Sequence, residues 1–243
     1  MSAFADHSRT VLFVEGPDAE HFLQNLLTQD VSQLRAAGIQ FAALLSPQGK
    51  ILHDMFLVAE GARILIDTPT RYYETLRKRL MLYKLRSQVT IGMADLPVYY
   101  ATDAGLPDPR HPALPRRVYG DAPAAPLAPD AVAAQALALG IPDSARDFEP
   151  DSVVALDAGY DLLHGVSFSK GCYVGQEICA RMHYKQIARR GFYVLARDGV
   201  PHKLALLKFD EVEAAHGLVV EDGTTYHATL PDWWAPKRPA SAS

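Results

Sequence analysis

The order of apolar and polar positions predicts a chain in which strands and helices are interspersed. Residues 9–16 form an apolar run typical of a strand, and residues 17–31 repeat their apolar side chains at helical spacing after a Gly-Pro-Asp start. Residues 39–69 contain three apolar runs separated by the turns SPQGK and EGA, which predicts an antiparallel meander. Residues 71–87 read as a second helix, with two further strands at residues 88–102. Local strand pairing with interspersed helices favours an α+β fold over a doubly wound sheet.

Shifts in composition divide the chain into parts. Seven prolines lie between Gly105 and Ala131, which predicts an irregular connection there. We therefore expect an N-terminal lobe at residues 1–104, the connection at 105–130, a second α+β part at 131–190, a short C-terminal β segment at 191–235 and a disordered tail at 236–243.

Composition narrows the class of protein. The 243 residues carry a net charge of −4, so a globally basic surface is absent and nucleic acid is not an expected partner. The two cysteines, Cys172 and Cys179, are too few for a disulfide framework or a zinc site, and we expect the single chain to hold no metal. No apolar run has the length of a membrane helix, and the first residues lack a signal-peptide pattern. We therefore expect a cytoplasmic protein without a membrane partner.

The segment KGCYVGQE at residues 170–177 is the most unusual stretch and carries the candidate chemistry. Its two glycines allow a positive φ or a close backbone approach, and a thiol lies between them. Lys170, two residues before Cys172, would favour the thiolate, which makes these two residues the candidate catalytic pair. The alternative is a glycine-bounded turn around a buried cysteine, which spacing alone favours by roughly two to one. Cys179 has apolar neighbours on the following helix and is expected in the core.

This segment, followed by AR and later by RR, resembles the signature of the YgfZ-type family of folate-binding proteins, which assist iron–sulfur protein maturation. The resemblance covers most of the chain, including residues 16–31, 44–58 and 166–184. It implies the fold of the T-protein of the glycine cleavage system, with α+β lobes in a ring, a short C-terminal barrel and folate in the central opening. It also implies an accessory factor in 4Fe–4S protein assembly or repair, with tetrahydrofolate as cofactor and iron–sulfur scaffold or client proteins as partners.

The resemblance further implies which residues meet the folate. Relatives place a glutamate at the pterin position, where this chain has the shorter Asp157; a turn or cap role is the alternative for this residue. Asp54, an acid within the apolar strand ILHDMFLV, matches an aspartate that helps activate folate in the T-protein, although His53 is the other candidate match. The motif and its helix are expected to contribute the remaining cofactor-binding residues, Tyr173, Gly175, Gln176, Glu177 and Arg181.

The anionic tail of a folate would need cations. No Asp or Glu occurs between Ile178 and Arg197, whereas Arg181, Lys185 and Arg189 would share one face of a helix that ran so far. For each of these residues singly, a solvated basic surface is the alternative.

Two other functions compete with the assembly factor. A folate-dependent aminomethyltransferase would need a carboxylate at the reacting nitrogen, for which Asp54 is the candidate, but the cysteine signature is typical of the assembly branch. A redox-active thiol protein would need a resolving cysteine, and no CxxC pair is present. The sequence therefore favours an accessory factor rather than a conventional enzyme, with Cys172 contacting a cluster, a partner or an oxidant.

Overall fold

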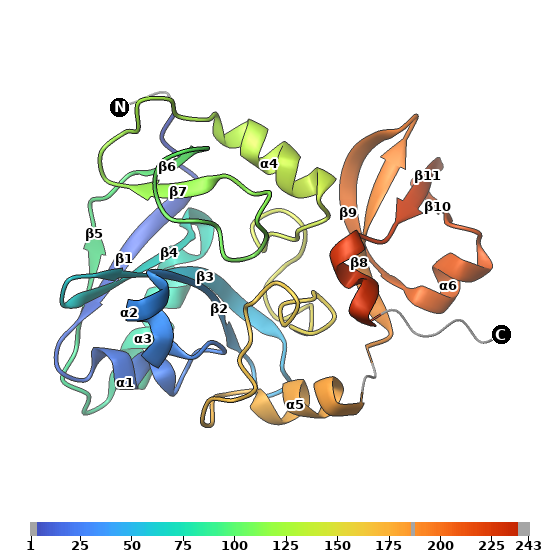
Figure 1. The fold of residues 1–243 in the computed structure, drawn as a ribbon. Coiled ribbons are helices and arrows are strands. Elements are labelled where there is room, and N and C mark those ends of the chain that lie inside the picture. The colour runs from blue at the N-terminus through green and yellow to red at the C-terminus, as the bar shows by residue number, and fades with distance from the viewer. Residues whose placement is uncertain (1–3, 186–187, 238–243) are drawn as a thin grey trace.

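A computed structural model describes residues 4–185 and 188–237 and shows an α+β protein built around three antiparallel sheets. Figure 1 shows the N-terminal lobe on one side of the molecule and the C-terminal lobe on the other. The chain between residues 139 and 185 runs between the two lobes. The architecture agrees with the α+β class expected from the sequence.

A five-stranded sheet organises the N-terminal lobe. Its strands are β1 (Arg9–Glu15), β2 (Ile39–Leu45), β3 (Ile51–Glu60), β4 (Arg63–Pro69) and β5 (Thr90–Ala94). The order is β2-β3-β4-β1-β5, and every neighbouring pair is antiparallel. β2 and most of β3 are buried at successive positions, because elements cover both faces of the sheet. Burial on both faces explains why these strands read as continuous apolar runs.

Short helices cover one face of this sheet. They are α1 (Ala19–Gln24), α2 (Leu34–Ala37) and α3 (Tyr73–Lys84), with the 3-10 turns η1 (Val31–Gln33) and η2 (Thr70–Tyr72). The helix expected over residues 17–31 is therefore shorter than predicted. After α1 the chain turns to pair with β2: Leu27 forms a β-bridge with Leu44, and the Thr28 N–H donates to the Ala43 carbonyl at 2.9 Å.

The middle of the chain packs on the other face of the sheet. It contains the hairpin strands β6 (Val98–Ala101) and β7 (Arg116–Tyr119) and the helices α4 (Pro129–Ala138) and α5 (Gln176–Lys185). The Pro-rich segment 105–130 thus includes a strand. The described residues 139–175 form neither helix nor strand, yet they belong to the core, since the Tyr160 ring lies edge-on to Phe41 with centroids 4.9 Å apart.

The C-terminal lobe is a short open sheet rather than a closed barrel. Its elements are β8 (Arg190–Arg197), β9 (Val200–Lys208), α6 (Phe209–Ala214), β10 (Leu218–Glu221), β11 (Thr224–Thr229) and the 3-10 turn η3 (Asp232–Lys237). The strand order is β10-β11-β8-β9, and within the described residues no pairing joins the two outer strands. The Trp233 indole donates to the Leu139 carbonyl at 2.9 Å and so anchors η3 to the middle of the chain. Residues 238–243 of the expected tail lie outside the described residues.

Candidate functional site

Lys170 ties the motif segment to the N-terminal lobe. Its side chain is buried, and its ammonium donates to the backbone carbonyls of Gln24, Leu27 and Gln29 at 2.5, 2.5 and 3.1 Å. These three bonds use all three N–H donors of the ammonium. Burial lowers the pKa of Lys170 to about 8. Lys170 therefore has no donor left for the Cys172 thiol and acts as a structural anchor, and an effect of its charge on that thiol stays a prediction.

Tyr173 and Gly175 hold the segment at two further points. Tyr173 is buried, and the Lys170 ammonium lies 5.1 Å from its ring centroid, within the range of a cation–π interaction. Gly175 has a φ of +83°, and a Cβ there would lie 2.5 Å from the carbonyl oxygen of Ser46 in the SPQGK turn. A residue with a side chain would be strained by both the φ and the contact. The motif glycine is therefore required by the approach of the segment to that turn.

These anchors leave Cys172 on the surface. Cys172 is exposed, whereas Cys179 on α5 is fully buried, so the alternative of a buried turn cysteine does not hold for Cys172. Among the residues that the structure describes, no group of three or more His, Cys, Asp or Glu side chains could hold a metal ion. Cys172 can therefore offer a single thiolate, and a metal centre bound there needs ligands from another molecule.

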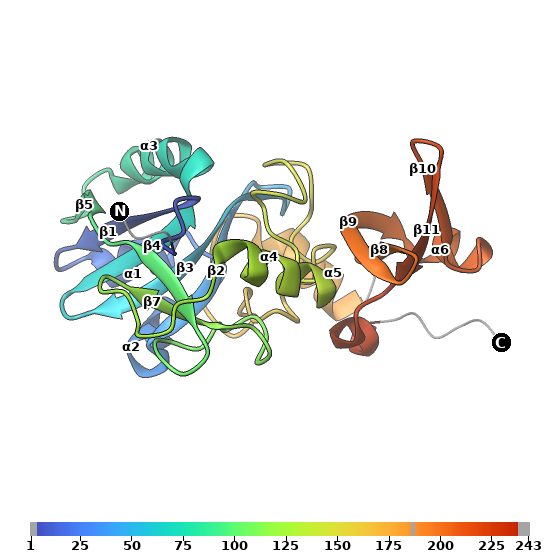
Figure 2. The same cartoon turned by 90° about the horizontal axis from the view of Figure 1, so that it is seen from above.

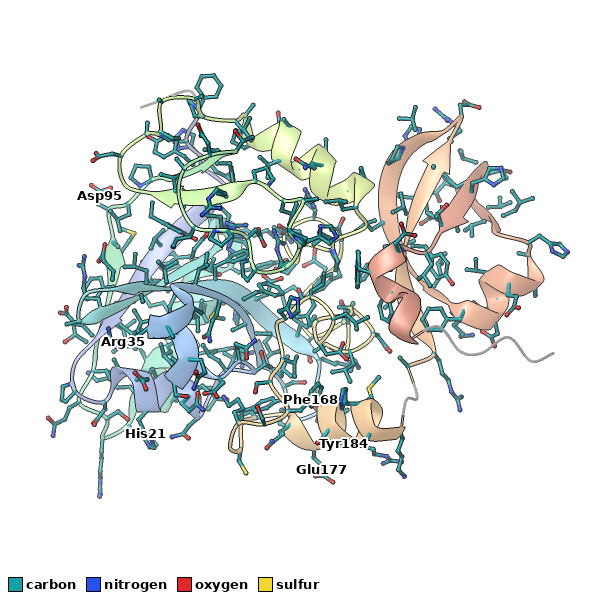
Figure 3. All side chains as sticks on the ribbon, in the orientation of Figure 1. His21, Arg35, Asp95, Phe168, Glu177 and Tyr184 are labelled. Carbon is teal, nitrogen blue, oxygen red and sulfur yellow. The ribbon has the colours of Figure 1, made fainter. Side chains whose placement is uncertain are left out.

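The surface around α5 carries the other polar side chains of the motif. Glu177 and Arg181 are exposed on the helix, and Gln176 is half-buried in its first turn. Figure 3 shows Glu177 and Tyr184 along this helix with Phe168 beside it. The Phe168 and Tyr184 ring centroids are 6.4 Å apart. Aromatic and charged groups together on an exposed surface suit contact with another protein.

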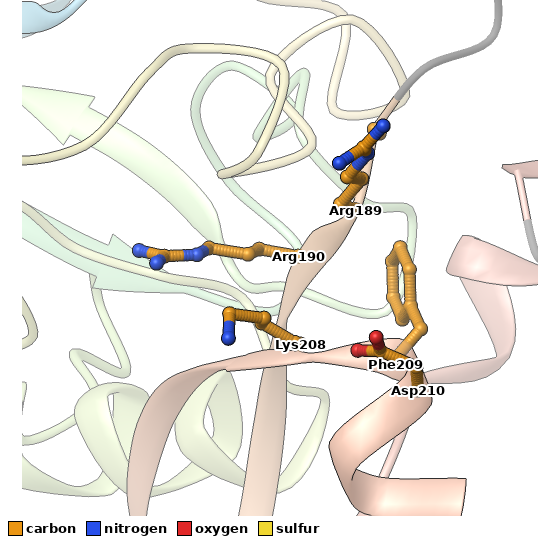
Figure 4. A pocket seen from close by; sticks show the side chains of 6 residues that line it. Arg189, Arg190, Lys208, Phe209 and Asp210 are labelled. Carbon is orange, nitrogen blue, oxygen red and sulfur yellow. The ribbon is translucent and has the colours of Figure 1, made fainter.

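The cations expected to continue along this helix are divided between two lobes. α5 ends at Lys185, the next two residues lie outside the described part, and Arg189 belongs to the segment before β8. The predicted shared helix face of Arg181, Lys185 and Arg189 therefore does not form. Arg189 instead lines a pocket of about 580 Å³ together with Arg190 and Lys208 (Figure 4).

Asp54 lies inside the molecule. Its two carboxylate oxygens accept hydrogen bonds from the Ser144 hydroxyl at 2.6 Å and the Tyr160 hydroxyl at 2.5 Å. Burial raises the pKa of Asp54, and the negative charge of Asp143 raises it further. His53 is buried too, and burial lowers its pKa to about 4. Asp54 thus links β3 to the middle of the chain, and a role at a reacting folate nitrogen would require these hydrogen bonds to open.

Asp157 lies in the irregular segment that packs against η3 of the C-terminal lobe. It is half-buried, and its backbone N–H donates to the Val154 carbonyl at 3.0 Å in a turn. The nearby Gly159 packs against the last aromatic residues, since a Cβ there would lie 2.5 Å from Trp233 and 3.1 Å from Trp234. This location suits a turn residue, and acceptance of a pterin edge by Asp157 stays a prediction.

A separate cavity of about 660 Å³ opens among β1, the β6–β7 hairpin and α4. Its lining is rich in arginine: Arg9, Arg71, Arg110, Arg117 and Arg146. Arg9 and Arg117 pair with buried Asp67 at 2.6 and 2.8 Å. Asp143 also lines the cavity; burial acts to raise its pKa, but neighbouring Arg9 and other arginines lower it. Neither Asp54 nor Asp157 is among the described residues of this lining. No local sequence pattern predicts this cavity, because its arginines come from separate segments of the chain.

The sequence of the whole chain is similar to those of known proteins. No family model matches the chain. It is 31% identical over 218 residues to the mitochondrial iron-sulfur cluster assembly factor IBA57 homolog of Mycosarcoma maydis, covering 75% of this chain and 54% of that protein. It is 26% identical over 303 residues to the mitochondrial iron-sulfur cluster assembly factor IBA57 of Homo sapiens, and this match covers 96% of this chain and 85% of that protein. These relatives are iron–sulfur cluster assembly factors. The chain spans about half the length of the fungal relatives, since the Neurospora crassa homolog, 27% identical over 222 residues, is covered over 51%.

Among solved structures, the fold resembles that of the glycine cleavage system aminomethyltransferase T from Bartonella henselae. The TM-score is 0.66, and the match covers 93% of this chain and 84% of that chain. At 12% sequence identity this likeness shows the fold alone, and it confirms the expected T-protein fold. The narrower YgfZ assignment stays a prediction.

The expected cytoplasmic location is wrong by the same comparison. The relatives are named as mitochondrial proteins. That expectation rested on the lack of a leader pattern, which does not identify a compartment. In the part of the chain that the structure describes, no helix combines the length and apolar character needed to cross a membrane.

Proposed function

We propose that this chain is an accessory factor in the assembly or repair of iron–sulfur proteins and that it acts through Cys172. The observation that carries the proposal is the contrast within the motif: Lys170, Tyr173 and Gly175 are fixed by the protein interior, whereas Cys172 is exposed between them. An exposed thiol is the reactive kind, and buried thiols such as Cys179 are inert. The iron–sulfur assembly role of the relatives supports the same conclusion.

The chemistry open to Cys172 is ligation. As a thiolate it gives up its proton and donates one sulfur ligand to an iron of a cluster. Clusters are usually held by four thiolates, so the remaining ligands must come from a scaffold or client protein. The cluster is then cargo that passes between two proteins, and Cys172 is the contribution of this chain to the transfer.

Tetrahydrofolate is the proposed cofactor, and the arginine-lined cavity suits it better than the surface of the motif. Its volume of about 660 Å³ lies within the usual range of small-molecule sites, roughly 300–1,000 Å³. Arg71, which pairs with exposed Glu149 at 2.8 Å, and Arg146, which pairs with Asp147 at 3.6 Å, are candidates to exchange these partners for the carboxylates of the folate tail. Asp143 offers a carboxylate for the donor edge of the pterin, with Asp157 as the alternative acceptor.

The test of the assembly role compares two cysteine variants in cells that lack the native protein. Activity of a 4Fe–4S client enzyme should be restored by the wild type and by Cys179→Ala, because Cys179 is fully buried and another protein cannot reach its sulfur. Cys172→Ser should fail, since the hydroxyl cannot replace a thiolate at iron. Equal expression of the three proteins is the control. Full restoration by Cys172→Ser would contradict the proposal.

An aminomethyltransferase is the second candidate, favoured by the fold alone. Asp54, its candidate catalytic carboxylate, is buried and has both oxygens bonded to Ser144 and Tyr160, which weighs against it. An assay of folate-dependent aminomethyl transfer from a lipoyl-bearing protein separates the two functions. Turnover that is lost in Asp54→Asn and kept in Cys172→Ser would favour the transferase.

A further inference from the structure

Helix α3 has two apolar faces. Leu76 and Leu80 are fully buried against the sheet, as expected of a covering helix. Met81, Leu82 and Leu85 lie on the other side, with 44, 71 and 86% of their surfaces exposed. Met93 on the edge strand β5 adds a further exposed side chain at the sheet face that α3 covers, because it pairs with Leu12 of the helix-side core. Figure 2 shows α3 at the outer surface, far from the C-terminal lobe.

The same surface is basic. Residues 75–94 contain five cations and no acid, in a chain whose net charge is −4. They are Arg77, Lys78, Arg79, Lys84 and Arg86. Among the described residues, none of the ion pairs or side-chain hydrogen bonds of the protein involves these five. The nearest acids in sequence, Glu74 and Asp95, lie at the two ends of the segment. The positive charge is therefore concentrated here, and within the described part of the chain none of these five cations forms an ion pair with an acid, although Asp18 lies beside Arg86 and the charge of Arg79 acts on buried His53.

Leu85 has a backbone conformation that is unfavourable for leucine. It caps α3 with φ 43° and ψ −108°, in a region that favours glycine. Its side chain nevertheless points into solvent, with 86% of its surface exposed. Glycine at this position would remove both the backbone strain and the exposed apolar surface. A strained and exposed leucine is the kind of feature found at binding surfaces.

We propose that the outer face of α3 docks on an anionic membrane surface, with Leu82 and Leu85 entering the interface and the surrounding cations facing lipid phosphates. Apolar side chains ringed by Lys and Arg are typical of interfacial helices. This inference is independent of the Cys172 chemistry. A membrane-spanning run is not needed for such contact, so the expectation of no membrane partner, which followed from the lack of that run, does not extend to this surface.

Two observations favour lipid over an acidic protein as the occupant. The surface is the protruding side of a helix, and a fluid interface moulds to protruding side chains such as Leu82 and Leu85, whereas a protein would need matching pockets. The positive charge of this face also complements an anionic membrane and would orient the protein on it. The rest of the chain has a net negative charge and would be repelled by anionic lipid.

The test is flotation of the full chain with vesicles of phosphatidylcholine alone or of equal parts phosphatidylcholine and phosphatidylglycerol. The wild type should bind the anionic vesicles at least about tenfold more tightly at low salt, and high salt should weaken this binding. Leu82→Gln and the double variant Lys78→Glu/Arg86→Glu should each weaken it on the order of tenfold. Val220→Gln is the matched control, since Val220 is 69% exposed on β10 in the other lobe.

Leu85→Gly separates docking from folding. It should melt no lower than the wild type, because strain is relieved, and yet bind anionic vesicles more weakly. Equal binding to both vesicle types, or unchanged binding in Leu82→Gln and Leu85→Gly, would overturn the proposal. Self-association of the wild type that these two variants abolish, without vesicle binding, would show instead that a second copy covers the surface.

Discussion

Replacement of Gly175 by alanine tests whether the motif is held by its contact with the SPQGK turn. The substitution adds one methyl group to a residue at φ +83°. That methyl carbon would lie 2.5 Å from the Ser46 carbonyl oxygen and 3.1 Å from the Leu45 Cβ. The backbone oxygen cannot move alone, because it accepts a hydrogen bond from the Gly49 N–H at 2.9 Å. The turn or the start of α5 must therefore shift.

The cost has three contributions. A left-handed conformation costs a residue with a side chain about 1–2 kcal/mol. Overpacking against a fixed neighbour adds roughly 1–3 kcal/mol. Loss of glycine freedom in the unfolded chain offsets about 0.4–1 kcal/mol of this. We therefore expect Gly175→Ala to lower the free energy of unfolding by about 2–4 kcal/mol, which is a fall in Tm of roughly 5–15 °C for a chain of this size.

Gly171→Ala is the matched control, from the same motif. Gly171 is outside the positive-φ region, and nothing lies within 4 Å of an added Cβ. Its free energy of unfolding should change by less than about 0.5 kcal/mol. Thermal unfolding followed by circular dichroism compares the two variants, with the alkylation rate of Cys172 as a second measurement. Equal Tm values for Gly175→Ala and Gly171→Ala would refute the contact with the turn as the reason for the glycine.

Three other measurements follow from the structure. Cys172 should react with iodoacetamide in the native protein, and Cys179 only after unfolding, because it is fully buried; mass spectrometry of the modified peptides decides this. In folate titrations, Asp157→Asn should weaken binding by about 2–4 kcal/mol if Asp157 accepts the pterin edge, and Asp143→Asn should do so if the arginine-lined cavity is the site. Wild-type affinity in both variants would remove both residues from the site. Burial lowers the pKa of His53 to about 4, below its ordinary 6.5, so the unfolded chain takes up a proton there before the folded protein does. The free energy of unfolding should therefore be highest above about pH 6.5 and should fall as the pH drops toward 4. His53→Leu should show a smaller loss of stability than the wild type over that interval, and parallel pH profiles would count against this assignment.

Local patterns in the sequence determine much of the fold. Apolar spacing placed the strands of the meander at residues 39–69 and the helix at 71–87, because side-chain period is a property of neighbouring residues. The motif at residues 170–177 supplied the family resemblance that pointed to the T-protein fold. The helix at 17–31 was predicted too long, since its end depends on pairing with β2, a contact that local period does not contain.

The roles of individual side chains were decided only by tertiary structure. Lys170 was expected to act on its neighbour Cys172, but its ammonium is bound by carbonyls 141 to 146 residues away in the chain. Asp54 was expected at a ligand, and it bonds to Ser144 and Tyr160, which are 90 and 106 residues away. The sequence shows which groups are charged and how they are spaced. The partner of each buried charge depends on which distant segments pack together in the folded protein. The exposed thiol of Cys172 follows from the same packing, because the residues on either side of it are the ones that the interior holds.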